Sequence, residues 1–238
     1  MAPCDDALQA VKARIRAACE AAGRGPDQVT LLAVSKTFGS AAIRSVHAAG
    51  QRAFGENYVQ EAAGKRDELA ALEALSWVLI GPLQSNKAAL AADVFDRVES
   101  VDRLKIAQRL SDARARLRAP LEVLVQVNIS GEASKSGVAP QDALPLAQAV
   151  AALPHLALRG FMGIAAPDVD VAVQRVQFSR LRGCIDAARA AGLALDVLSM
   201  GMSHDMEAAI AEGSTQVRIG TAIFGGRSTA TRAARDRE

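Results

Sequence analysis

The sequence predicts an α/β protein, a single (β/α)8 TIM barrel with an extra N-terminal helix. Short runs of β-branched and aliphatic residues alternate with Ala- and Leu-rich amphipathic stretches, as in parallel strands joined by crossover helices. The chain length of 238 residues suits such a barrel, which needs about 250. No linker rich in Gly, Ser or Pro divides the chain, so residues 1–226 are expected to form one domain.

The elements are expected in a regular order. Residues 5–22 form the extra helix, which would cap the bottom of the barrel or pack on its flank, and residues 23–26 (Gly-Arg-Gly-Pro) end it. The unbroken apolar run at residues 29–34 is typical of a parallel strand covered on both faces. Seven more strands are expected at residues 53–55, 77–80, 97–101, 121–129, 158–164, 197–200 and 216–219. Helices are expected at residues 40–49, 59–74, 103–118, 142–152, 171–191 and 205–211. Eight strand–helix units favour a closed barrel over an open sheet.

Bulk charge and hydropathy exclude several classes of protein. The formal net charge is +2, from 28 basic and 26 acidic residues, so we expect no binding to nucleic acid or to an anionic membrane. No apolar run approaches the ~18 residues of a membrane span, and the first ten residues lack a secretory signal. We expect a cytoplasmic monomer. Residues 227–238 are expected to be a disordered tail, with a basic contact arm as the less favoured alternative.

Cysteine and histidine give no sign of a disulfide framework or a metal site. Three widely spaced cysteines form no closed disulfide set and no metal-binding pair; they are Cys4, Cys19 and Cys184. The last two lie in helical patterns and are expected to be buried thiols. The histidines are equally scattered, at His47, His155 and His204. His204 falls at a helix start, where capping is favoured over catalysis.

Function in such a barrel gathers on the loops after the carboxyl ends of the strands. Lys36 ends the first, apolar strand, and a lysine partly removed from water can lose its proton and trap a carbonyl. On this feature alone, a lysine that extends to solvent is favoured. Glu56 and Asn57 follow the second strand and either orient a ligand or, as favoured, cap the next helix. The polar residues 84–87 after the third strand either face the mouth or begin a helix.

Two glycine-containing loops close the set of strand ends. Residues 199–203 (Ser-Met-Gly-Met-Ser) follow the seventh strand and residues 218–221 (Arg-Ile-Gly-Thr) the eighth, where such barrels commonly bind phosphate. Hydroxyl donors come from Ser199, Ser203 and Thr221. Arg218 stays protonated, and beside a pyridine nitrogen it would weaken the ring as an electron sink. A surface salt bridge is the alternative for an isolated arginine.

The segment after the fifth strand, residues 128–137, has the small-residue composition of a mobile lid. Its Lys135 could supply a second basic group near the mouth. A solvated loop lysine is the favoured interpretation.

Several motifs together resemble one family. They are residues 33–36 (Ala-Val-Ser-Lys), 54–61 (Phe-Gly-Glu-Asn-Tyr-Val-Gln-Glu), 80–87 (Ile-Gly-Pro-Leu-Gln-Ser-Asn-Lys), 198–203 (Leu-Ser-Met-Gly-Met-Ser) and 217–220 (Val-Arg-Ile-Gly). Over residues 31–226 the chain resembles the pyridoxal phosphate homeostasis protein family, single-domain proteins that bind pyridoxal 5′-phosphate (PLP). Their barrel is similar to the N-terminal domain of alanine racemase.

The resemblance implies a PLP site and a function. It implies Lys36 as the Schiff-base lysine, Arg218 near the pyridine nitrogen, and Asn57 and Met200 lining the ring. It implies phosphate contacts from Ser199, Gly220 and Thr221. Members of the family have no established catalytic activity and are thought to store, buffer or deliver PLP to apo-enzymes in vitamin B6 homeostasis.

Two departures and two alternatives accompany the resemblance. The family usually has histidine where this chain has Val78, and often has a second lysine where it has Phe38, so any role of those groups in PLP release is in doubt here. A PLP-dependent racemase or decarboxylase is the enzyme alternative. Such an enzyme needs a second domain, for which the dozen residues after Gly226 are expected to be too few. The racemase also needs an acid–base tyrosine supplied by its partner, and Tyr58, the single tyrosine of this sequence, follows the second strand. A barrel that binds another phosphorylated metabolite is a third hypothesis.

Overall fold

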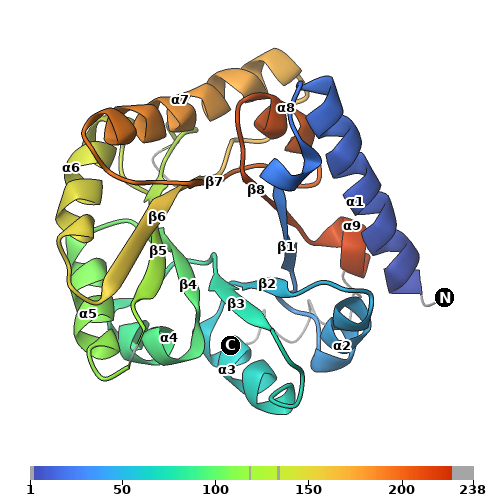
Figure 1. The fold of residues 1–238 in the computed structure, drawn as a ribbon, viewed down its shortest axis with the longest axis horizontal. Coiled ribbons are helices and arrows are strands. Elements are labelled where there is room, and N and C mark those ends of the chain that lie inside the picture. The colour runs from blue at the N-terminus through green and yellow to red at the C-terminus, as the bar shows by residue number, and fades with distance from the viewer. Residues whose placement is uncertain (1–2, 118, 133–134, 227–238) are drawn as a thin grey trace.

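A closed barrel of eight parallel strands forms the centre of the molecule (Figure 1). The computed structural model describes residues 3–117, 119–132 and 135–226. The strands follow chain order around the barrel: β1 (Thr30–Val34), β2 (Ala53–Glu56), β3 (Ser76–Leu79), β4 (Arg97–Val101), β5 (Leu121–Val127), β6 (Leu156–Gly163), β7 (Val197–Ser199) and β8 (Gln216–Ile219). Pairing of β1 with β8 closes the ring. The predicted (β/α)8 TIM barrel is confirmed.

Helices surround the strands in Figure 1. They are α1 (Pro3–Ala21), α2 (Ser40–Ala48), α3 (Val59–Glu68), α4 (Ala88–Val94), α5 (Leu104–Arg114), α6 (Pro140–Ala151), α7 (Val171–Ala190), α8 (Met206–Ala211) and α9 (Thr221–Phe224), with 3-10 turns η1 (Pro26–Gln28) and η2 (Ser85–Lys87). The expected helix over residues 59–74 ends early. After Leu69, which is buried, the backbone hydrogen bonds of Ala70 and Leu72 become i→i+3 bonds.

The extra helix α1 packs on the flank of the barrel, against α2, α8 and α9 (Figure 1). Arg14 on α1 forms an ion pair with Glu207 on α8 at 2.6 Å. Arg24, just after the helix, donates to the carbonyl oxygens of Ile210 and Ser214 at 2.9 and 2.7 Å. These contacts fasten the beginning of the chain to the β8 side, so α1 covers the seam where the barrel closes.

Ion pairs link the amino-terminal ends of neighbouring strands. Arg97 on β4 donates to Glu122 on β5 at 2.6 and 2.8 Å, and Arg159 on β6 donates to both Glu122 and Asp196. The hydrogen bond from Arg159 lowers the pKa of Asp196 below its usual value. The network lies at the opposite end of the strands from the expected site and therefore has a structural role.

Buried apolar side chains form one main cluster between the barrel and the helices. Cys19 and Cys184 are buried free thiols, as predicted, whereas the side chain of Cys4 lies outside the described part of the chain. Residues 227–238, expected to be a disordered tail, also lie outside it. Within the described ranges, no group of acidic, histidine and cysteine side chains could hold a metal. None of the helices described is both long and apolar enough to cross a bilayer.

Candidate functional site

A cavity of about 280 Å³ lies at the carboxyl ends of the strands, where the sequence predicts the site. The loops after β1, β2, β7 and β8 supply most of its wall. Its lining residues are Val34, Lys36, Phe38, Asn57, Ile80, Ile164, Met202, Ser203, His204, Arg218, Gly220 and Thr221. Five of the seven predicted site residues are therefore brought together: Lys36, Asn57, Arg218, Gly220 and Thr221.

Lys36 stands at the first turn after β1 and is partly buried. The residue before it, Ser35, is fully buried, and the residue after it, Thr37, has a φ of 71°. The end of an apolar strand thus brings the amine to the cavity rather than to bulk water. An amine held at a cavity wall can react with a carbonyl group of a ligand.

Arg218 is fixed inside the mouth of the barrel. Its Nη1 donates to the carbonyl oxygen and Oγ of Ser199 at 2.7 and 2.8 Å, and its Nη2 donates to the Gly163 carbonyl at 2.8 Å. Burial lowers the pKa of Arg218, while the charges of Glu99 and Asp205 oppose that shift. The surface salt bridge considered for this arginine is wrong. The side chain is a buried cation with a fixed orientation.

A glycine shapes the backbone of each predicted phosphate loop. Gly220 comes so close to β1 that an added Cβ would lie 3.1 Å from the Val34 carbonyl oxygen. Gly201 has a φ of +97°, and an added Cβ would lie 2.6 Å from the Cβ of Ala209. The backbone therefore requires glycine at position 201 and strongly favours it at position 220. Thr221 and Ser203 provide the hydroxyl groups that line the cavity.

Ser199 and Met200 do not line the cavity. Both are fully buried. Ser199 Oγ donates to Glu99 Oε2 at 2.7 Å and accepts from Gln216 Nε2 at 3.0 Å and from Arg218. In this arrangement the Ser199 hydroxyl holds the Arg218 side chain in place. The expected contact of Ser199 with a phosphate stays a prediction, and so does the expected contact of Met200 with a pyridine ring.

The structure overturns the helix-capping interpretations near the mouth. Tyr58 is the N-cap residue of α3, so neither Glu56 nor Asn57 caps that helix. Glu56 is fully buried, and burial raises the pKa of its carboxyl, although a hydrogen bond from Lys65 opposes the shift. His204 does not cap α8, whose N-cap is Asp205; it lines the cavity instead. The position of Asn57 directly after a strand indicated that it could line the site. The sequence contained no such indication for His204.

A second, smaller cavity of about 210 Å³ adjoins the first and shares Asn57, Ile80 and Ile164 with it. Lys135 lines it, but its side chain is 43% exposed and lies 3.8 Å from Glu132. These contacts agree with the solvated loop lysine favoured from the sequence. Ile80 and Ile164 follow β3 and β6 and were missed as wall residues because aliphatic side chains carry no chemical signal.

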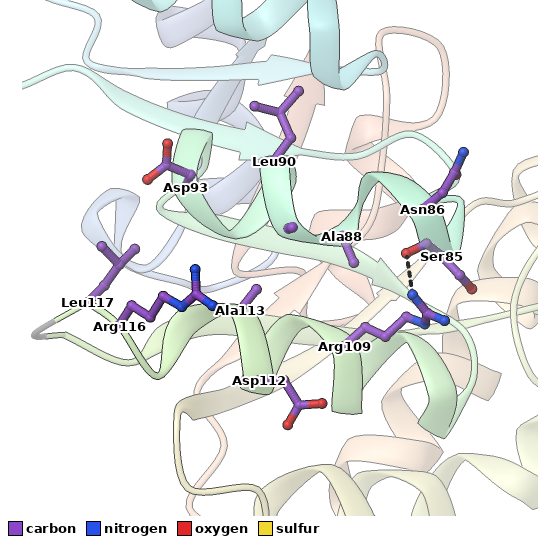
Figure 2. Close-up of a pocket in the computed structure, with 11 residues that line it drawn as sticks. Ser85, Asn86, Ala88, Leu90, Asp93, Arg109, Asp112, Ala113, Arg116 and Leu117 are labelled. Carbon is purple, nitrogen blue, oxygen red and sulfur yellow. Dashed lines mark hydrogen bonds between the residues drawn. The ribbon is translucent and has the colours of Figure 1, made fainter.

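A further hollow, of about 880 Å³, lies between α4 and α5 on the outside of the barrel (Figure 2). Ser85 and Asn86 line it, so the polar segment after the third strand does not face the mouth cavity, and these residues lie within η2 rather than at an N-cap. Figure 2 shows Arg109 pointing at the Ser85 carbonyl oxygen, 3.4 Å away. Exposed side chains of both charges form its walls, which makes it a solvated groove between helices.

Comparison with known proteins agrees with this geometry. Residues 7–228 match the family model "Alanine racemase, N-terminal domain". The pyridoxal phosphate homeostasis protein of Pseudomonas aeruginosa is 59% identical over 217 residues, covering 91% of this chain and 93% of that protein. Its Escherichia coli K12 counterpart is 51% identical over 227 residues, covering 92% and 95%.

Solved structures place the fold in the same group. Synechococcus elongatus PipY with PLP bound is 36% identical with a TM-score of 0.81, covering 93% of this chain and all of PipY (100%). Clostridium difficile alanine racemase is 15% identical with a TM-score of 0.71, covering 86% of this chain but 54% of the racemase, and shows the shared fold alone. The chain belongs to the pyridoxal phosphate homeostasis protein family.

Proposed function

We propose that this protein binds PLP through a Schiff base on Lys36 and acts in intracellular PLP homeostasis as a carrier, buffer or delivery factor. The observation that carries the proposal is the meeting of an amine, a buried guanidinium and a glycine–hydroxyl loop around one cavity. The PLP-bound PipY structure supports it, since PipY shares this fold over its whole length.

The residues present fit the three chemical groups of PLP. Lys36 would meet the aldehyde, and Arg218 would face the pyridine nitrogen. Gly220, Thr221 and Ser203 would hold the phosphate through a backbone N–H and two hydroxyl groups. When bound, PLP supplies an aldehyde that condenses with an amine and releases one water molecule. Asn57 also lines the cavity and would limit movement of the ring.

The buried charge of Arg218 favours a role without catalysis. PLP enzymes stabilise carbanions by drawing electrons into the ring, and the ring draws them more strongly when its nitrogen is protonated. A guanidinium fixed by three hydrogen bonds can donate to that nitrogen but disfavours its protonation. The alternative, an amino-acid racemase, also lacks support from Tyr58, which is 50% exposed and is not a residue of the cavity wall.

The remaining parts of the proposal concern partners and place. We place the protein in the cytoplasm as a monomer that binds neither nucleic acid nor membranes, and whose recipients are apo-forms of PLP-dependent enzymes. The near-neutral formal charge of +2 supports the lack of nucleic-acid binding.

Spectroscopy and mass mapping test the assignment of Lys36. Purified protein mixed with PLP should develop the visible band of a protonated imine, and borohydride reduction should fix PLP to the peptide that contains Lys36. Lys36→Ala should abolish both signals, and Lys135→Ala, which changes a lysine of the adjoining cavity, should leave them. A retained band in Lys36→Ala would show that the assignment is wrong. Turnover of D- or L-alanine by the holo-protein would refute the non-catalytic role.

A further inference from the structure

Thr37, the residue directly after Lys36, has an unusual backbone conformation. Its φ of 71° lies in the left-handed region, which β-branched residues rarely adopt because Cβ then crowds the backbone. The conformation redirects the chain immediately after the lysine. Such a residue persists only where its surroundings enforce it.

The enforcing contact comes from α3. The backbone N–H of Thr37 donates to Glu61 Oε1 at 2.7 Å. Glu61 in turn accepts from Lys65 Nζ, one helical turn further along, at 2.8 Å. The strained residue is therefore held by a carboxylate that is itself held in place.

Lys65 links the same carboxylate to the other neighbour of Lys36. Its buried ammonium donates to the Ser35 carbonyl oxygen at 2.9 Å and to Glu56 Oε1 at 2.7 Å. Ser35 Oγ also donates to Glu56 Oε1, at 2.6 Å. The three N–H groups of the Lys65 ammonium therefore have three acceptors, which are the Ser35 carbonyl oxygen, Glu56 and Glu61. The backbone is thus held on both sides of Lys36.

We propose that Glu56, Glu61 and Lys65, called here the clamp, are positioning residues that aim Lys36 into the cavity and set how fast its covalent link to PLP forms and breaks. None of the three lines the cavity, so the clamp acts through the backbone of Ser35 and Thr37. The inference rests on the proposed function, because it concerns the amine that the function assigns to PLP.

A rescue experiment tests the clamp. Glu61→Ala removes the acceptor of the Thr37 N–H but leaves Lys65 paired with Glu56, so the fold is expected to persist, as thermal unfolding would verify. Formation of the imine band after mixing with PLP should slow about tenfold, the effect expected when a left-handed residue loses its support. Adding Thr37→Gly should restore the rate, since glycine adopts this conformation without help. Glu68→Ala, an exposed carboxylate on the same helix, is the matched control and should react at the wild-type rate.

A second measurement needs no PLP. In the apo-protein, hydrogen exchange of the Thr37 amide should be slow in wild type and in Glu61→Gln, whose amide oxygen can still accept, and fast in Glu61→Ala. A wild-type rate of imine formation in Glu61→Ala would overturn the clamp, and so would a slowed rate that Thr37→Gly fails to restore. Borohydride mapping separates the two hypotheses: an adduct away from Lys36 refutes the proposed function, whereas an adduct on Lys36 with unaltered rates refutes the clamp alone.

Discussion

Replacing Ser199 by alanine would distinguish a buried support from a phosphate ligand. The hydroxyl takes part in three hydrogen bonds: it donates to Glu99 at 2.7 Å and accepts from Arg218 at 2.8 Å and from Gln216 at 3.0 Å. Two of these partners are charged, and all lie inside the barrel. Without the hydroxyl, one carboxylate oxygen of Glu99 loses a donor with no access to bulk water.

The magnitude follows from these contacts. A hydrogen bond to a charged group contributes about 1.5–3 kcal/mol, and a buried group left without a partner costs about 1–3 kcal/mol. Because these terms overlap, we expect Ser199→Ala to lower the free energy of unfolding by about 2–4 kcal/mol. Thr221→Ala, which alters an exposed hydroxyl on the cavity wall, should change it by less than about 0.5 kcal/mol.

Two assays separate the roles. Urea unfolding followed by circular dichroism gives the free energy of unfolding of each apo-protein, and loss of the imine band after dilution gives the rate of PLP release. We expect Ser199→Ala to be the less stable protein and Thr221→Ala to release PLP faster. If Ser199→Ala unfolds like wild type and releases PLP faster than Thr221→Ala, Ser199 contacts the phosphate directly and the structural reasoning is wrong.

Two further predictions concern the stability of the barrel. A depressed carboxyl pKa contributes stability above its unfolded value and loses it as the pH falls through the folded one. The Arg159 hydrogen bond lowers the pKa of Asp196 from 3.8. The free energy of unfolding should therefore fall more steeply below about pH 4 in wild type than in Asp196→Asn. Urea unfolding at a series of pH values measures this, and the same pH dependence in both proteins would contradict it. Gly160→Ala should lower the free energy of unfolding by about 3 kcal/mol or more, since the φ of Gly160 is +155° and an added Cβ would lie 1.8 Å from a carbonyl oxygen of β7. At Gly183 an added Cβ would meet nothing within 4 Å, so Gly183→Ala should not be destabilised. Equal melting temperatures for the Gly160→Ala and Gly183→Ala proteins would contradict this prediction.

The barrel and the position of its site could be predicted from sequence because both follow from strand periodicity. Once the eight strands are placed, their carboxyl ends must meet at one mouth. Lys36 follows the first strand of the barrel, and Arg218 lies in the last. Pairing of β1 with β8 therefore brings the two residues to the same part of the mouth. Neither inference required knowledge of a side-chain rotamer.

The direction of individual side chains could not be predicted. Ser199 ends β7, and Ser203 follows it in the next loop. The left-handed turn at Gly201 lies between them, and one hydroxyl faces the inside of the barrel while the other lines the cavity. The clamp was missed for a similar reason. Glu61 and Lys65 appear as an ordinary i,i+4 pair on a helix surface, and nothing local indicates that the helix presses this pair against the first strand.

The seam between β1 and β8 has a consequence for synthesis of the protein. Leu32, four residues before the proposed PLP-binding lysine, is paired with Arg218 on the last strand. A nascent chain therefore exposes Lys36 early but cannot surround it until the last strand of the barrel, β8, has left the ribosome. Because a ligand stabilises only the state that binds it, PLP would stabilise molecules in which β8 has joined β1. Loading with PLP would then report that the barrel had closed.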